Sequence, residues 1–200
     1  MNVLTIDLPG HGKDTSDMND TWDFPYIAHA LDEVLSQYDM YDVYLLGYSM
    51  GGRVALYYAL NGSVALRGLL LESTSAGIQS EADKVERVQV DAARAKVLEI
   101  AGLEIFVNDW EKLPLFRSQY ELDAEVRKAI RANRMSQNPV RLAKALRDYG
   151  TGNMPNLWPH VSSLSVRTLI LTGEKDEKFV QIGQKLKEEI PNSHTVQVSD

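Results

Sequence analysis

The sequence contains no cysteine among its 200 residues. Disulfide bonds and thiolate metal sites are therefore excluded, and the absence agrees with the cytoplasmic location that we predict. No run of about 18 or more apolar residues occurs, so no membrane span is expected. The first residues, MNVLTIDLPGHG, also lack the basic region and the small-residue cleavage site of a secretory signal.

Positive charge is in short supply, because 21 Lys and Arg stand against 28 Asp and Glu and the net charge is −7. This balance argues against non-specific nucleic-acid binding, and we predict no nucleic-acid partner. The four histidines are scattered without metal-ligand spacing, so no metal site is predicted. The chain does have an apolar composition of 44%, which is enough for one domain with a sizeable core. The sequence does not define an oligomeric state.

Short apolar runs alternate with helical patterns in the first part of the chain. Strands are predicted at 2–8, 42–47 and 66–73, with helices from about residue 22 and over 50–62. Strands alternating with helices are typical of a parallel sheet with covering helices.

The pattern changes in the middle of the chain. Residues 80–149 show only helical periodicity, and alternation returns with predicted strands at 166–173 and 194–198 around a helix over about 178–190. We therefore predict an α/β fold with a mostly parallel sheet and a helical cap inserted between strands. The predicted division is a core of residues 1–75 and 161–200, with the cap at 76–160.

The segment LLGYSMGGR contains a G-x-S-x-G motif between a predicted strand and a predicted helix, with its serine at Ser49. A sharp turn there would leave no room for side chains at Gly47 and Gly51 and would raise the serine hydroxyl above the sheet. We predict that Ser49 is a nucleophile. The N–H of Met50, at the start of the helix, is the predicted oxyanion donor.

An acid and a histidine should complete a catalytic triad. Asp176 directly follows a predicted strand and is the predicted acid, with Glu174 and Glu177 as competing carboxylates. No histidine fits, because His194 precedes the last strand instead of following it. We expect a chain that is cut at both ends, with the triad histidine beyond Asp200 and a second oxyanion donor before the first residue.

Five segments together resemble one family: DLPGHG, GYSMGGR, NDWEKLPLF, YGTGNMPNLW and TGEKDEKF. They resemble the menaquinone-pathway synthases that make 2-succinyl-6-hydroxy-2,4-cyclohexadiene-1-carboxylate, and the resemblance covers nearly the whole chain. It implies an α/β-hydrolase-fold lyase that eliminates pyruvate from a succinyl-substituted cyclohexene carboxylate. It also implies that the serine takes a proton from the substrate, and that no metal or organic cofactor is needed.

The same resemblance implies a binding site for a small anionic carboxylate substrate. The implied substrate-binding residues are Tyr48, Arg53, Arg87, Trp110 and Arg131, with Arg134 as a neighbouring alternative to Arg131. Charge agrees, because residues 76–160 hold 8 of the 11 arginines and sum to +1, whereas the remainder sums to −8. Arginine forks match carboxylates in a bidentate way.

Two other functions fit the same motifs. One is a serine hydrolase of carboxylesters or C–C bonds, in which Ser49 forms an acyl-enzyme. A hydrolase of neutral esters would favour an apolar cap, so the arginines favour the lyase. The other is a non-catalytic receptor for a small ligand that has lost a triad member.

Overall fold

The computed structural model describes residues 2–38 and 40–199. The chain forms two compact units. One unit, the sheet unit, contains Trp22–Lys84 and Met154–Asp200, and the other, the helical unit, contains Met1–Thr21 and Val85–Asn153. The sheet unit contains a four-stranded sheet, and the predicted division into a core and a cap stays a prediction.

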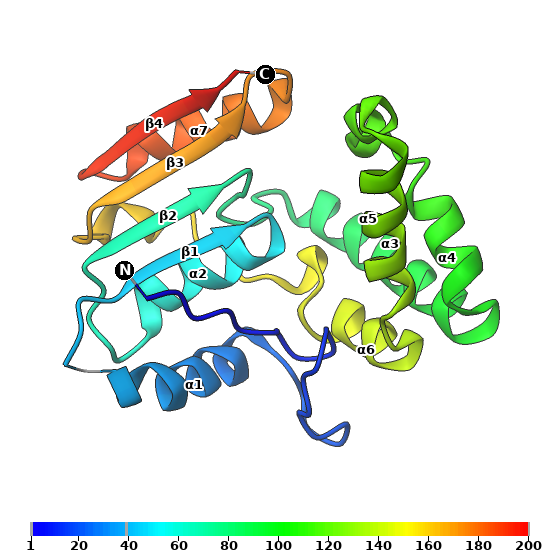
Figure 1. The fold of residues 1–200 in the computed structure, drawn as a ribbon. Helices are drawn as coiled ribbons and strands as arrows, with labels where there is room; N and C mark the ends of the chain where they lie inside the picture. The colour runs from blue at the N-terminus through cyan, green and yellow to red at the C-terminus, as the bar shows by residue number, and fades with distance from the viewer. Residues whose placement is uncertain (1, 39, 200) are drawn as a thin grey trace. The chain divides into compact units, whose positions relative to one another are not determined.

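The sheet is entirely parallel, with neighbouring strands in the order β1-β2-β3-β4 (Figure 1). The strands are β1 (Tyr44–Tyr48), β2 (Gly68–Glu72), β3 (Thr168–Gly173) and β4 (Ser193–Val198). They confirm the four strands predicted from residue 42 onward, with small shifts at the ends. Because the strands are parallel, their carboxyl ends lie at the same edge of the sheet.

The helices of the sheet unit are α1 (Phe24–Leu35), η1 (Ser36–Tyr38), α2 (Met50–Asn61), η4 (Val161–Ser163) and α7 (Glu177–Glu189). Asp23 starts α1, because its side chain accepts a hydrogen bond from the Tyr26 N–H at 2.8 Å. Helix α2 packs on β1 and β2, and α7 packs on β3 and β4. Leu56 of α2 and Leu71 of β2 are completely buried in this interface.

One face of β1 is exposed. Tyr44, Leu46 and Tyr48 alternate along this strand and are each more than half exposed. The alternation follows from strand geometry, since successive side chains point to opposite faces. Leu45 and Gly47, on the other face, are shielded by α2.

The helical unit contains most of α3 (Glu81–Ile100) and then only helices within the described residues. These are α4 (Gly102–Trp110), η2 (Pro114–Glu121), α5 (Ala124–Met135), α6 (Pro139–Tyr149) and η3 (Thr151–Asn153). Its apolar core contains Ala95, Leu98 and Ala143, with Phe106 and Leu142 packed against them. The prediction that residues 80–149 are helical is confirmed.

The predicted strand at residues 2–8 is wrong, because the structure has no strand in that segment. An apolar, β-branched run becomes a strand only when a neighbouring strand pairs with it, and no described segment does so. A turn follows this segment. The His11 N–H donates to the Leu8 carbonyl at 2.9 Å, and Gly10 and Gly12 adopt positive φ angles of 85° and 55°.

The described part of the chain includes no helix that is both long enough and apolar enough to span a bilayer.

Candidate functional site

Ser49 occupies a strained turn between β1 and α2. Its φ of 50° and ψ of −108° lie in the region that favours glycine, at a cost of about 1–3 kcal/mol for another residue. Three hydrogen bonds hold it there. The Ser49 N–H donates to the Glu72 carbonyl at 2.8 Å, and the Ser49 carbonyl accepts from the Thr74 hydroxyl at 2.8 Å and the Arg53 N–H at 3.2 Å. The end of β2 therefore supports this conformation, as expected for a nucleophile elbow.

Two glycines allow this turn to close. A Cβ at Gly47 would lie 2.3 Å from the Gly51 carbonyl oxygen, and a Cβ at Gly52 would lie 2.6 Å from the Thr74 Cβ. At Gly51, by contrast, a Cβ would meet nothing within 4 Å. The prediction that Gly51 must lack a side chain is therefore wrong. The second close approach falls one residue later, where α2 meets the end of β2.

We expect Gly47→Ala to lower the free energy of unfolding by about 2–4 kcal/mol, because the new methyl group would collide with backbone. Gly51→Ala is the matched control, since it makes the same chemical change two residues after Ser49, where a Cβ would meet nothing within 4 Å. It should leave stability unchanged or raise it by up to about 1 kcal/mol, as alanine favours helix over glycine. Urea midpoints measure both. Equal midpoints for the two variants would contradict the steric explanation.

Met50 and Arg53 lie in the first turn of α2, beside Ser49. Met50 is the first residue of the helix, so its N–H has no acceptor within the helix. This N–H lies at the positive end of the helix dipole. Arg53 is half-buried one turn after Ser49, on the same side of the helix. Tyr48, the last residue of β1, is more than half exposed. These residues form the local surroundings in which an anion would be stabilised.

Asp176 follows β3 at the same carboxyl edge of the sheet. Its carboxylate accepts a hydrogen bond from the Phe179 N–H at 3.2 Å and caps α7, which fixes one carboxylate oxygen and leaves the other to a second donor. Asp176 is half-buried, whereas Glu174 and Glu177 are exposed. Of the three competing carboxylates, Asp176 is therefore the one held in a defined position.

Two strand spacings separate β3 from β1, which amounts to about 10 Å. An imidazole that hydrogen-bonds to both Ser49 and Asp176 could bridge such a gap together with the two side chains. Within residues 2–38 and 40–199, no histidine hydrogen-bonds to either residue. His194 lies in β4, three strands and about 14 Å from β1. His29 and His160 are exposed.

His11 is the histidine with a defined environment. It belongs to the helical unit, where its Nδ1 lies 2.9 Å from the Tyr149 hydroxyl and 3.2 Å from the Pro9 carbonyl oxygen. Burial lowers the pKa of His11 below its ordinary value, although the Pro9 contact acts in the opposite direction. A lowered pKa favours the neutral imidazole, and the ring contacts with Tyr149 and Pro9 stabilise the turn.

Arg87 of α3 presents a guanidinium to solvent. Its Nε donates to the Asp91 carboxylate at 2.9 Å, and its side chain is 34% exposed. Its two terminal nitrogens have no other partner within the described part of the chain. They remain available to the two oxygens of a carboxylate, which is the geometry that arginine offers to such ligands.

Arg131 is engaged differently. Its two terminal nitrogens each donate at 2.7 Å, one to Glu111 and one to Asn108. Arg134 shares Glu111, at 3.0 Å, and also donates to Gln119 at 2.9 Å. A ligand carboxylate at Arg131 would have to compete with these partners, so Arg131 is less available than Arg87.

Trp110 belongs to a cluster of rings at the end of α4. Its ring stacks on Phe106 with centroids 5.5 Å apart, lies 5.6 Å from Phe116, and carries the Arg94 guanidinium at 5.1 Å. The cavity beside it has a volume of about 110 Å³. Pockets for small-molecule ligands usually measure about 300–1,000 Å³, so this cavity alone does not hold a substrate.

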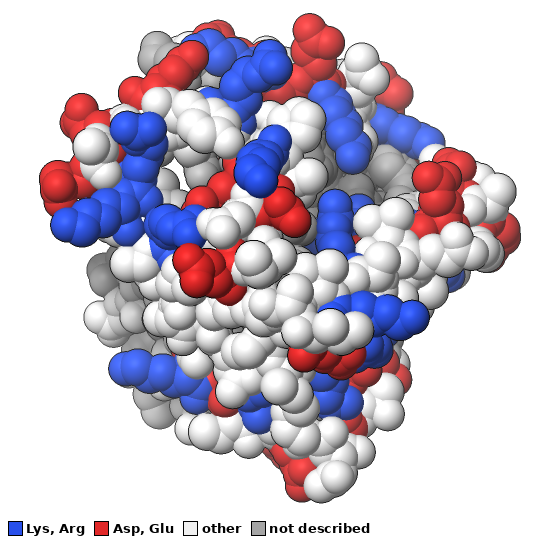
Figure 2. Space-filling view, turned by 90° about the vertical axis from the view of Figure 1, so that its right-hand side faces the viewer, with Lys and Arg blue, Asp and Glu red and all other residues white. Residues whose placement is uncertain are grey.

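Most described arginines between residues 76 and 160 have acidic partners. The pairs are Arg87 and Arg94 with Asp91, Arg131 and Arg134 with Glu111, Arg141 with Asp14, and Arg147 with Glu99. On the face drawn in Figure 2, basic and acidic side chains are correspondingly interspersed. The net positive charge of residues 76–160 is therefore not gathered in one positive patch. Anion binding in this segment depends on individual guanidinium groups.

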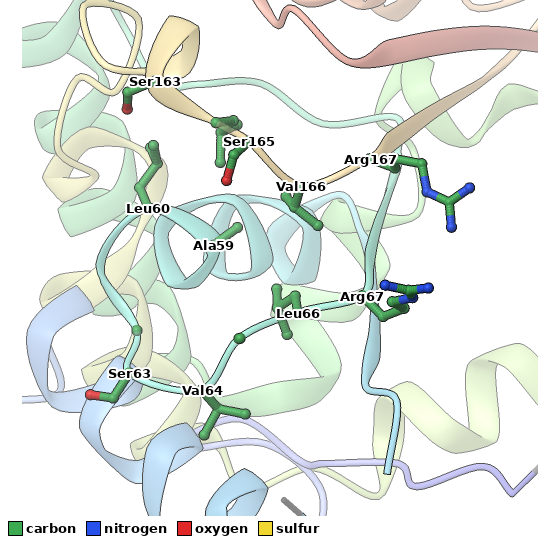
Figure 3. A pocket seen from close by; sticks show the side chains of 13 residues that line it. Ala59, Leu60, Ser63, Val64, Leu66, Arg67, Ser163, Ser165, Val166 and Arg167 are labelled. Carbon is green, nitrogen blue, oxygen red and sulfur yellow. The ribbon is translucent and has the colours of Figure 1, made fainter.

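A larger cavity, of about 420 Å³, lies at the opposite edge of the sheet from Ser49. It is lined by the loops that lead into β2 and β3, over residues 62–67 and 163–167, with Arg67 and Arg167 on its rim (Figure 3). It contains none of the predicted site residues. The amino edge of a parallel sheet is also not where such sheets bind ligands, so we do not assign the reaction to it.

Sequence reasoning did not identify Asp91 and Glu111, the acids that hold the predicted arginines. A signal for Asp91 was present, because an acid four residues after Arg87 on a helix lies on the same side. No comparable signal exists for Glu111, which is far from Arg131 in sequence.

Known proteins resemble this chain over nearly its full length. A profile of the alpha/beta hydrolase fold family matches residues 1–200. The 2-succinyl-6-hydroxy-2,4-cyclohexadiene-1-carboxylate synthase of Yersinia enterocolitica is 33% identical over 185 residues, which cover 92% of this chain and 66% of that protein. A Bacillus subtilis (strain 168) protein assigned to the same synthase is 36% identical over 192 residues, which cover 96% of this chain and 70% of that protein.

A solved structure is more similar still. The structure of MenH from S. aureus superposes with a TM-score of 0.96 at 60% sequence identity, and the match covers 97% of this chain and 73% of that one. The chain thus spans about two thirds to three quarters of the length of these proteins.

Proposed function

Because this chain belongs to the 2-succinyl-6-hydroxy-2,4-cyclohexadiene-1-carboxylate synthase family of the α/β-hydrolase fold, we propose that it is a lyase of menaquinone biosynthesis. The proposed reaction eliminates pyruvate from 2-succinyl-5-enolpyruvyl-6-hydroxy-3-cyclohexene-1-carboxylate. The observation that carries this proposal is the 60% identity to MenH over 97% of the chain.

The names of the substrate and the product define the bond changes. One ring double bond at carbon 3 becomes two, at carbons 2 and 4, and the enolpyruvyl oxygen leaves carbon 5. A proton must therefore leave carbon 2, the C–H electrons form the double bond from carbon 2 to carbon 3, and the original double bond shifts to carbon 4 as the C–O bond breaks. The enolpyruvyl oxygen keeps the electron pair of the broken C–O bond, and the resulting enolate becomes pyruvate when it is protonated. The protein has to supply a base and hold the substrate.

Ser49 is the proposed base, with Asp176 as the acid of a Ser-His-Asp triad. A histidine oriented by Asp176 would accept the serine proton, so that the serine oxygen could take the proton from carbon 2. The N–H of Met50, at the positive end of α2, would stabilise negative charge that develops during the step. The prediction that the histidine follows Asp200 stays a prediction. The fixed, strained backbone of Ser49 supports its role, since strain of this kind clusters at functional sites.

The substrate is anionic, and we assign its carboxylates to arginines. Arg87 is the preferred partner because its terminal nitrogens are available, and Arg53 lies one helical turn from Ser49. Arg131 would contribute only if it exchanged Glu111 for the ligand. Trp110 and Tyr48 are the proposed aromatic contacts.

We interpret residues 76–160 as the cap of this enzyme and residues 1–75 and 161–200 as its hydrolase-fold core. The cytoplasmic location stays a prediction. No cofactor takes part in the proposed chemistry, which needs only proton transfer and charge stabilisation.

A direct assay tests the function. The full-length protein is incubated with the cyclohexene substrate while pyruvate release is followed, and p-nitrophenyl esters are offered in parallel. We expect pyruvate release with a kcat/KM far above that for the esters. Ester turnover that is much faster than pyruvate release would instead identify a hydrolase, and binding of the substrate without any turnover would identify a receptor.

A further inference from the structure

Asp91 is a buried carboxylate at the centre of α3. Only 2% of the residue is exposed, although it carries a negative charge. One oxygen accepts from the Arg87 Nε at 2.9 Å and lies 3.8 Å from an Arg94 terminal nitrogen. The other accepts from the Gly152 N–H at 3.2 Å. A buried charge is tolerated because it is paired and hydrogen-bonded in this way.

The pairing fixes the side chain of Arg87 in a specific manner. Asp91 binds Nε, which lies next to the flexible stem, and not the two nitrogens at the tip. A long side chain anchored at this point loses much of its rotamer freedom before any ligand arrives. The ordering of such a side chain otherwise opposes binding by about 0.5–1.5 kcal/mol.

The glycines of the YGTGNMPNLW segment lie close against α3 around Asp91. A Cβ at Gly150 would lie 2.8 Å from an Asp91 carboxylate oxygen, and a Cβ at Gly152 would lie 2.6 Å from the Val88 backbone nitrogen. The turn between α6 and η3 therefore closes tightly over α3 at this carboxylate. This contact gives that segment a physical purpose which its sequence alone does not reveal.

Asp91 is also connected, through Arg94, to Trp110, another predicted ligand contact in the helical unit. Arg94, which lies 3.8 Å from Asp91, places its guanidinium 5.1 Å above the Trp110 ring. Burial is the main cause that lowers the pKa of Arg94, and the nearby Arg87 charge acts in the same direction, while Asp91 opposes both. Asp91 thus holds two like charges side by side on one helix.

We propose that Asp91 is a positioning residue for substrate binding, which holds Arg87 so that its two terminal nitrogens face a substrate carboxylate. The inference rests on the proposed function, because it takes Arg87 to be a substrate ligand. Asp91 itself touches no reacting atom.

A double-mutant cycle in the full-length protein tests this proposal. The variants are Asp91→Asn, Arg87→Gln and their combination, and calorimetry measures the Kd of 2-succinyl-6-hydroxy-2,4-cyclohexadiene-1-carboxylate. Asp91→Asn should raise the Kd by about two- to tenfold. This factor corresponds to the free energy of ordering one long side chain, which the variant would have to supply on binding. In the Arg87→Gln background the same change should have less than about a twofold effect, since the residue it acts through is gone. In turnover, Asp91→Asn should raise KM more than it lowers kcat.

Glu99→Gln is the matched control, because it removes the same charge from the same helix and breaks the exposed pair with Arg147. It should leave the Kd unchanged. Equal losses from Asp91→Asn in both backgrounds would overturn the proposal and reduce Asp91 to a structural role. Should Asp91→Asn fail to fold, Arg87→Lys replaces it, since lysine has no Nε–H for Asp91 to hold. Wild-type affinity in Arg87→Lys would likewise overturn the proposal.

Side-chain NMR separates this inference from the proposed function. A wild-type protein that does not bind the product refutes the function, but the Arg87–Asp91 contact is still measurable. The Nε–H proton of Arg87 should exchange with water more slowly than that of the exposed Arg117, and Asp91→Asn should remove the difference. Equally fast exchange in the wild type would overturn the positioning role, whatever the result of the binding experiment.

Discussion

Replacing Ser49 with alanine should lower kcat/KM for pyruvate release by about 10³- to 10⁶-fold in the full-length protein, the range seen when a triad serine is removed. The expected cause is loss of the oxygen that takes the substrate proton, not loss of the fold. The backbone of Ser49 is held by Glu72, Thr74 and Arg53, and none of these bonds uses the serine hydroxyl. Circular dichroism and the Kd of the product should therefore remain near their wild-type values.

Ser73→Ala is a suitable control for this experiment. Ser73 is also a serine at the end of a strand with a positive φ, of 43°, so alanine there meets a comparable backbone conformation. Its replacement should leave turnover within about twofold, as is usual for substitutions without a functional role. Substantial pyruvate release by Ser49→Ala would refute the assignment of the base. Equal losses in both variants would point to strain at the strand ends.

Asp176→Asn should lower kcat/KM by about 10²- to 10⁴-fold, because a neutral amide cannot stabilise the imidazolium or hold the imidazole in the productive tautomer. Asparagine is as good a helix cap as aspartate, and its oxygen can still accept from the Phe179 N–H. The thermal midpoint should therefore change little. The experiment would thus separate activity from stability within one side chain, since one oxygen caps α7 and the charge has the proposed role in the triad.

Glu174→Gln and Glu177→Gln are the controls for Asp176. Both residues are exposed carboxylates within two residues of Asp176, Glu174 in the turn after β3 and Glu177 at the start of α7, so each variant removes the same charge close to β3. Neither should change kcat/KM by more than about twofold, because exposed charges are largely screened by solvent. A large loss in one of them, with Asp176→Asn active, would transfer the acid to that residue.

Local motifs made the elbow predictable from sequence. The strand, the turn at Ser49 and the helix after it follow from a short pattern, and the structure has them where the pattern predicts. The reason for the glycines was only half correct. Gly52 is required by Thr74, a neighbour that lies two residues after the end of β2 and is not visible in the motif.

The sequence predictions failed where contacts between residues far apart in the sequence determine the structure. Residues 2–8 have the composition of a strand, yet pairing requires a partner that composition cannot supply. The sequence also did not show which arginines are available to a ligand. Asp91 binds Arg87 at Nε and leaves its terminal nitrogens available, whereas Glu111 binds a terminal nitrogen of Arg131. Periodicity identifies which side of a helix a residue lies on, but not which of its atoms a distant carboxylate will occupy.

The connection between β2 and β3 also has a consequence for the order of folding. Leu69 pairs with Thr168, so two neighbouring strands are joined through the entire helical segment. Closing a long loop is thermodynamically inexpensive, since each doubling of length adds only about 0.6 kcal/mol. It does slow the search, because folding rates fall as contacts become more distant in sequence.

The elbow forms within the contiguous segment of β1, α2 and β2, whereas Asp176 arrives only when β3 joins the sheet. In refolding from urea, the far-ultraviolet signal should therefore recover before pyruvate release does, and superimposable time courses would contradict this order. Ser49 would adopt its strained conformation early, but its proposed acid, Asp176, would be in place only after β3 has paired with β2, which is far from it in sequence.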